Sequence, residues 1–217
     1  MDSVLEPILH SPRLPEYFRE IERRLREESE RRQKFYDEVT DEGKWEFIDG
    51  QVIMHSPAMS RHLYAVKHLT KLLDTYVSIR QLGVVHTEKC MCRFPRNDYE
   101  PDVVFFGVEK AGDFNAKTML FPPPDLVVEV LSDSTAKNDR GVKFEDYGQH
   151  VPEYWIIDAD QEIVEQYVQR PEGYHLKIKA ASGDLASEAV PGFSIPVRAI
   201  FDEAENLGTL QQLLKQV

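Results

Sequence analysis

The chain has 217 residues, of which 41% are hydrophobic, and its 26 basic and 38 acidic side chains give a formal net charge of -12. This charge disfavours a broad, sequence-indifferent nucleic-acid surface, which would normally be basic, while no apolar run approaches the roughly 20 residues of a membrane span. We expect no signal peptide, and the two cysteines, Cys90 and Cys92, exclude a disulfide framework and favour the reducing cytoplasm.

Residues 15–36 are dense in Glu and Arg, and Tyr17, Phe18, Ile21 and Leu25 recur among them at helical spacing. This pattern predicts an amphipathic helix with a narrow apolar stripe that packs along one seam. A contact between two copies of the chain, giving a homodimer, is the alternative. Because its acids and bases nearly cancel, the segment is not a basic arm for nucleic acid.

A hairpin is predicted next, by the sequence WEFIDGQVIMHSP. Its Asp49-Gly50 pair is a strong two-residue turn signal, which places Ile48 opposite Gln51 and Glu46 opposite Ile53. From Ser60 to about Ile79, apolar residues recur at steps of three and four, so we expect a helix with one buried face that ends at Gly83.

The remaining elements complete a mixed α/β domain with no visible linker. We expect strands at 84–94, 102–106 and 126–131, a helix at 137–149 and a strand at 153–158, followed by strands at 163–168 and 174–179 and a short helix at 207–214. The core order is helix, three strands, helix, strand, with extra strands at both ends.

Two acids stand in or beside buried strands. Asp102 opens the apolar run VVFF, and Glu129 interrupts the run VVEVL. An ionised carboxylate is costly to bury alone, so these acids are ion-paired, metal-bound or catalytic. If the strands are neighbours, the pair can hold Mg²⁺ or Mn²⁺, which prefer oxygen ligands. In the competing interpretation, Asp102 caps a turn and Glu129 pairs with a basic side chain.

The helix that follows carries Asp139, Lys143 and Tyr147 on one face, four residues apart. Lys143 is either a solvated partner of Asp139 or a group that points back to Glu129 and orients a water molecule. Ser132, Ser134 and Thr135 are interpreted as helix caps, because no Ser-His-acid pattern accompanies them.

Other residues of the sequence could bind a metal ion or contact a substrate. His86, Glu88, Cys90 and Cys92 alternate on one predicted strand face, but neighbours i and i+2 are roughly 6.5 to 7 Å apart, so four cannot close around one ion. Pattern alone makes His62 a core or capping histidine, with a substrate contact as the alternative, and Glu46 a surface acid. There is no phosphate-binding glycine loop or dinucleotide fingerprint.

Taken together, several motifs resemble a known family. The segments YEPDVVFF, PPPDLVVEVLSDST, D-x-x-x-K-x-x-x-Y and PEYWIID, with the hairpin EFIDGQVIMHSP and His62, resemble the Uma family of restriction endonuclease-like proteins. The resemblance runs from about Lys44 to Val168. It implies the PD-(D/E)XK nuclease superfamily, whose core order is the one given above, and therefore an α/β restriction endonuclease-like fold with a mixed sheet.

The resemblance also implies functional residues. Asp102 is the Asp of the PD element and Glu129 the second acid, both ligands of a catalytic Mg²⁺ (or Mn²⁺). Leu131 stands where the superfamily has a lysine, and the resemblance implies that Lys143 replaces that lysine in space. Glu46 and His62 fall in shared motifs and are expected to line the site.

These observations predict a cytoplasmic, Mg²⁺-dependent endonuclease that hydrolyses DNA, with no membrane partner. A non-catalytic interaction module, such as a homodimer that kept the nuclease fold, is the alternative, and an RNA substrate is a third. We expect a helical extension over residues 1–43 and a restriction endonuclease-like domain over residues 44–217.

Overall fold

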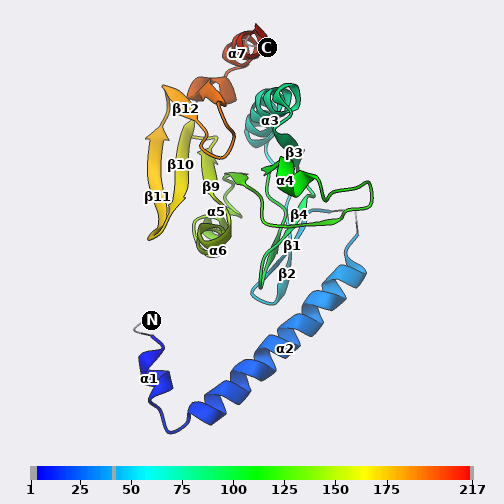
Figure 1. Cartoon of the computed structure of the whole chain (residues 1–217), viewed down its shortest axis with the longest axis vertical. Coiled ribbons are helices and arrows are strands. Elements are labelled where there is room, and N and C mark those ends of the chain that lie inside the picture. The colour runs from blue at the N-terminus through cyan, green and yellow to red at the C-terminus, as the bar shows by residue number, and fades with distance from the viewer. Residues whose placement is uncertain (1–3, 41–42, 216–217) are drawn as a thin grey trace.

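The computed structural model describes residues 4–40 and 43–215, with two main sheets, a small third sheet and helices around them (Figure 1). Residues 1–3 and 41–42 of the expected extension, and residues 216–217 of the expected domain, lie outside the described part. Within that part, no helix is long and apolar enough to cross a membrane.

The helices are α1 (Glu6–Leu9), α2 (Leu14–Glu38), α3 (Ser60–Arg80), α4 (Val108–Ala111), α5 (Ala136–Asp139), α6 (Val142–His150) and α7 (Glu203–Lys215), with a 3-10 turn η1 (Val197–Ile200). The strands are β1 (Trp45–Ile48), β2 (Gln51–Met54), β3 (Gly83–Thr87), β4 (Met91–Arg93), β5 (Asp98–Tyr99), β6 (Val103–Gly107), β7 (Leu120–Phe121), β8 (Leu126–Val130), β9 (Glu153–Asp158), β10 (Ile163–Arg170), β11 (Gly173–Ala180), β12 (Asp184–Ala186) and β13 (Ser194–Pro196).

The larger sheet is mixed, in the order β11-β10-β9-β8-β6-β3. Only β8 and β9 run parallel, as expected for strands joined by a helical crossover, and the other pairs are antiparallel. The smaller sheet has the order β2-β1-β5-β4-β7, and β12 pairs with β13. The expected mixed α/β fold is confirmed.

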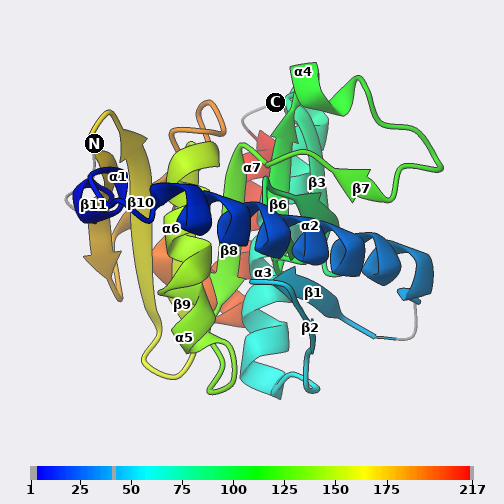
Figure 2. The ribbon, with the colours of Figure 1, turned by 90° about the horizontal axis from the view of Figure 1, so that it is seen from below.

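Side chains alternate between the two faces of the larger sheet. Val103, Val128 and Trp155 face α3 and the C-terminal segments, which form one core cluster. On the opposite face, Val104 and Val127 pack with Tyr147 of α6 and with residues of the smaller sheet. Figure 2 shows α6 lying over this face, so a polar residue that shares the alternation of Val104 and Val127 must point toward α6.

The hairpin is formed in the predicted register. Ile48 pairs with Gln51 and Glu46 with Ile53, around a turn in which Asp49 and Gly50 both have positive φ. Helix α3 also matches its prediction, since it runs from Ser60 to Arg80, but the residue that ends it is Gln81 and not Gly83, because Gln81 already adopts the left-handed conformation at φ 55°.

The predicted strand at 84–94 is wrong. The chain leaves the larger sheet at Thr87, turns through Glu88 and Lys89 at φ 40° and 47°, and enters the smaller sheet as β4. The apolar side chains of β3 are partly buried and those of β4 are buried, so the apolar pattern continues across the break and conceals it. His86 and Cys92 therefore belong to different sheets, and the expected common strand face does not exist.

The predicted helix at 137–149 is interrupted between α5 and α6. Gly141 departs from helical geometry with φ -113° and ψ -109°, and a Cβ at this position would lie 2.7 Å from the Lys137 carbonyl oxygen. The chain turns at this glycine, yet the side chains of Asp139 and Lys143 still meet.

The second half of helix α2 packs against the smaller sheet. Arg32 forms an ion pair with the fully buried Asp98 at 2.6 Å, and Phe35 stacks on Phe47. Figure 1 shows the first half of α2 running away from the body of the protein. Because Phe18, Ile21 and Leu25 are 57%, 49% and 49% exposed, the predicted packing of this stripe along one seam is wrong within the described chain.

Candidate active site

Asp102 and Glu129 occupy matching places on two adjacent antiparallel strands. Val103 of β6 pairs with Val128 of β8, so Asp102, one residue before, lies across from Glu129, one residue after. Directly opposed residues point to the same face of a sheet. Both acids are at most 3% exposed and share the face covered by α6. The chain therefore brings the two predicted carboxylates together.

Asp102 is held from three directions. Its Oδ2 accepts a hydrogen bond from the backbone N–H of Val130 at 2.8 Å, and its Oδ1 lies 2.7 Å from Lys44 Nζ and 3.5 Å from His62 Nε2. His62 stands near the start of α3, and its Nδ1 is buried without a hydrogen-bond partner.

Glu129 is held from α6. Its Oε1 accepts hydrogen bonds from Lys143 Nζ and the Tyr147 hydroxyl, both at 3.0 Å. Lys143 is 1% exposed, and its Nζ also lies 2.9 Å from Glu46 Oε1 and 3.2 Å from Asp139 Oδ1. The ammonium is thus enclosed by three carboxylates and points toward the strand that carries Glu129, not to solvent.

Glu46 lies behind Lys143. It is fully buried, receives the backbone N–H of Glu100 on Oε1 at 3.0 Å, and contacts His55 Nε2 through Oε2 at 2.9 Å. It does not line the cavity described below, so it reaches the site through Lys143.

The site carboxyls have pKa values that differ widely. Burial, together with the nearby Asp139 and Asp102 carboxylates, raises the pKa of Glu129 to about 8 despite the Lys143 ammonium. Burial also opposes ionisation of Asp102, but His62 and Lys44 hold the pKa of its carboxyl well below its ordinary range. The surroundings therefore favour the ionised form of Asp102 and oppose that of Glu129, and opposite shifts in one site are typical of acid–base sites.

A cavity of about 300 Å³ opens onto these groups. Asp102, Glu129, Lys143, Lys44 and His62 all contribute to its wall. Among the described residues, no three His, Cys, Asp or Glu side chains form a ready-made metal cluster. Two carboxylates on one cavity nevertheless suit Mg²⁺, which keeps several waters and often takes only one or two protein carboxylates.

The structure brings all five predicted site residues into one neighbourhood. Two more members were missed: Lys44, bound to Asp102, and His55, bound to Glu46. The signal for both was the hairpin register, because the backbone N–H of His55 donates to the Lys44 carbonyl and continues the ladder beyond Trp45. Alternation along the two strands then places Lys44 and His55 on the face of Glu46.

Residues 27–198 match the Uma2 family, whose description is "Putative restriction endonuclease". The chain belongs to the Uma2 family. The expected family is confirmed, and the matched residues contain the whole site described above.

Two proteins are similar to this Uma2 chain, one in sequence and one in structure. Uncharacterized protein sll1609 of Synechocystis sp. is 31% identical over 128 residues, which cover 57% of this chain and 71% of that protein. A crystal structure of "a putative nuclease belonging to DUF820" from Anabaena variabilis has a TM-score of 0.68 at 16% identity, covering 80% of this chain and 97% of that one. At this identity the likeness shows a shared fold, which confirms the restriction endonuclease-like architecture.

Proposed function

We propose that this Uma2 protein is a nuclease that hydrolyses phosphodiester bonds in DNA with the help of Mg²⁺ or Mn²⁺. The observation that supports this most strongly is the opposition of Asp102 and Glu129 across β6 and β8, on one cavity, with Lys143 bound to Glu129. The family description and the shared fold point to the same reaction class.

Asp102 and Glu129 would hold the cation through their carboxylate oxygens. A divalent cation there activates water and stabilises charge that develops on the phosphate. Asp102 is suited to this role because its carboxyl ionises readily, and the Val130 N–H fixes its orientation. Ligand carboxyls must be deprotonated, so a bound cation would favour the ionised form of Glu129, which burial opposes.

The other residues would orient these ligands and contact the substrate. Lys143 and Tyr147 fix the Glu129 carboxyl, and the Lys143 ammonium places positive charge at the cavity wall, where it would offset charge on the phosphate. His62 lies beside Asp102 and lines the cavity, which suits contact with a substrate oxygen.

Plasmid cleavage tests this function. Supercoiled DNA is incubated with the protein and Mg²⁺ or Mn²⁺, and with the variants Asp102→Ala, Glu129→Ala and Asp184→Ala. Asp184 is an exposed acid of β12 and serves as the matched control. We expect nicking by the wild type and Asp184→Ala only. Equal cleavage by all four proteins would refute the assignment of Asp102 and Glu129.

We also propose that the protein forms a homodimer through the extension of residues 1–43. The apolar stripe of Phe18, Ile21 and Leu25 is exposed, and Arg23 beside it pairs with Glu20 and Glu27. A surface that mixes both charges around an apolar stripe is complementary to a second copy of itself.

Both cysteines are free, which supports a reducing compartment such as the cytoplasm.

A further inference from the structure

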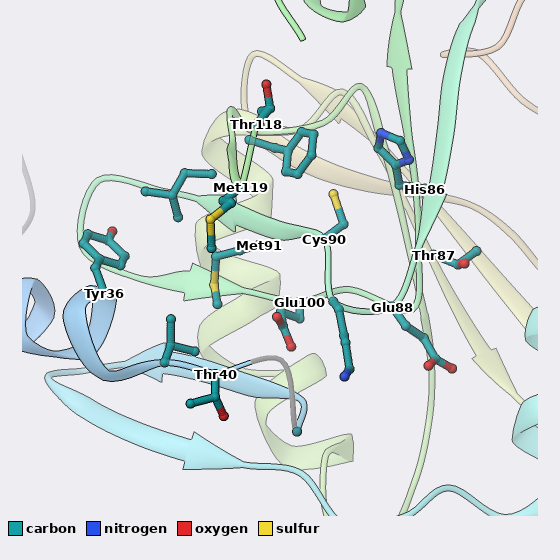
Figure 3. A pocket seen from close by; sticks show the side chains of 15 residues that line it. Tyr36, Thr40, His86, Thr87, Glu88, Cys90, Met91, Glu100, Thr118 and Met119 are labelled. Atoms are coloured by element: carbon teal, nitrogen blue, oxygen red, sulfur yellow. The ribbon is translucent and has the colours of Figure 1, made fainter. Parts of the chain in front are cut away.

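A second pocket, of about 500 Å³, neighbours the carboxylate cavity. Its wall combines ring, thioether and thiol groups with a few polar ones, among them Tyr36, Phe121, Met91, Cys90 and Glu100. Figure 3 looks into this pocket, with Met91, Met119 and Cys90 around the space and the Glu100 carboxylate at its lower end. The proposed catalytic groups lie outside it.

The pocket lies next to the carboxylate cavity. Glu88, in the turn between β3 and β4, lines both spaces. On the other side, Ser56, His62 and Ser132 are shared between the carboxylate cavity and a third cavity of about 440 Å³. The three cavities therefore lie in a row, called the track below, with the carboxylate cavity between the other two.

Few basic side chains line these cavities: among the described residues they are Lys44, Lys143, Arg61 and Lys89. Lys44 and Lys143 face carboxylates at 2.7 Å and 3.0 Å, and Arg61 is paired with Asp160. The whole chain carries a net charge of -12. Proteins that bind duplex backbones neutralise phosphates with basic side chains, whereas single strands are also held by stacking of bases on aromatic groups.

We propose that the pocket receives an unpaired nucleobase of the strand whose phosphate lies at Asp102 and Glu129. This inference rests on the proposed nuclease function and makes its substrate class a single-stranded or locally unpaired nucleic acid. The Tyr36 and Phe121 rings and the Met91 thioether provide apolar contact for the base. The Glu100 carboxylate, which accepts one hydrogen bond from the Trp45 N–H at 2.9 Å, can also accept one from an exocyclic amino group of the base.

Two leucines provide a matched pair of variants. Leu120 lines the pocket on the edge strand β7 and is 38% exposed, while Leu176 lies on the edge strand β11 and is 43% exposed. Leu120→Glu places a carboxylate where the base would sit, and Leu176→Glu makes the same change away from the track. Both positions are open enough for the folded chain to accept the new side chain.

The experiment measures fluorescence anisotropy of labelled oligonucleotides, with Ca²⁺ in place of Mg²⁺ to suppress cleavage. Single-stranded DNA, single-stranded RNA and a blunt DNA duplex are titrated with each protein. We expect the wild type to bind at least one single strand about tenfold more tightly than the duplex, and Leu120→Glu to weaken that binding about tenfold, as loss of one stacked base predicts. Leu176→Glu should bind like the wild type.

Duplex binding as tight as single-strand binding would overturn the inference. So would equal affinities of the two leucine variants, or no binding of any oligonucleotide by the wild type. Failure of the nuclease function is seen separately, as plasmid cleavage that does not depend on Asp102 and Glu129. The two proposals can therefore fail independently.

Discussion

Lys143 is the residue on which the buried charges of the site depend. Its ammonium faces Glu46, Glu129 and Asp139, and these acids raise the pKa of Lys143 well above its usual range although burial acts against the charged form. Removing one partner of a buried ion cluster leaves unpaired charge and typically costs about 3 to 5 kcal/mol.

We therefore expect Lys143→Met to lower the free energy of unfolding by about 3 to 5 kcal/mol, measured by urea unfolding. The exposed Lys137, on α5, provides the control, since Lys137→Met should change stability by less than about 0.5 kcal/mol. A loss below about 1 kcal/mol in Lys143→Met would show that the acids do not need this lysine.

For single residues, the sequence predicted which side chains form the site better than it predicted the contacts between them. Glu129 was conspicuous because an acid interrupts an apolar strand, and helical spacing placed Lys143 and Tyr147 on one face. Lys44 and His55 were missed because their importance comes from pairing across the hairpin, not from spacing along the chain. That three acids enclose Lys143 is a tertiary fact, because Glu46 arrives from the other sheet.

Among the elements, the interrupted helix pair α5–α6 is linked to β10 through the carboxylate of Glu165. Glu165 accepts hydrogen bonds from Arg140 at 2.8 Å and from the Tyr167 hydroxyl at 2.6 Å, and it also contacts Lys179. The Arg140 hydrogen bond, with support from Tyr167 and Lys179, lowers the pKa of Glu165 from 4.5 to about 2.

This shift predicts a pH dependence of stability. Because the unfolded chain takes up the proton first as pH falls, ionised Glu165 stabilises the fold above pH 4.5, and that contribution is lost between pH 4.5 and about 2. Glu165→Gln should therefore reduce the melting temperature at pH 7 and fall less steeply on acidification below pH 4.5. Parallel wild-type and variant curves across that range would contradict the assignment.

Another carboxylate joins the C-terminal segment to the larger sheet. Glu153 of β9 is fully buried and accepts hydrogen bonds from Trp155 and Gln166 on Oε1. Its Oε2 accepts three more, from the Ser187 hydroxyl and the N–H groups of Glu188 and Ala189. A glutamine has one acceptor oxygen and cannot serve both sets of donors.

We expect Glu153→Gln to cost about 2 to 3 kcal/mol in the free energy of unfolding, since buried donors lose their partner. Urea unfolding measures this, and hydrogen exchange should show faster exchange of the Glu188 and Ala189 amides. Unchanged stability with unchanged exchange would show that the donors find other acceptors.

Elements whose pattern lies entirely within one short stretch of sequence were predictable. The Asp49-Gly50 turn fixed the hairpin register, and the three- and four-residue steps fixed α3. The strand at 84–94 was mispredicted because alternation reports burial on one face and not which sheet provides it. The turn is formed by Glu88 and Lys89, which have positive φ, so no glycine marks it in the sequence.

At the scale of the whole molecule, the extended first half of α2 tests the proposed homodimer. We expect the wild type to sediment as a dimer and the double variant Phe18→Glu, Leu25→Glu as a monomer, because charges on the stripe oppose its burial. Leu207→Glu, at a leucine of α7 that is 47% exposed, is the matched control and should stay dimeric. A wild-type monomer, or a dimeric double variant, would disprove this contact.

The buried carboxylates form either a cation site or only a set of internal ion pairs. Calorimetric titration of Mn²⁺ into metal-free protein distinguishes the two most directly. We predict one Mn²⁺ site per chain that is lost in Asp102→Asn and retained in Asp184→Asn, with all three proteins folded by circular dichroism. The absence of binding by the wild type, or unchanged binding by Asp102→Asn, would contradict the account.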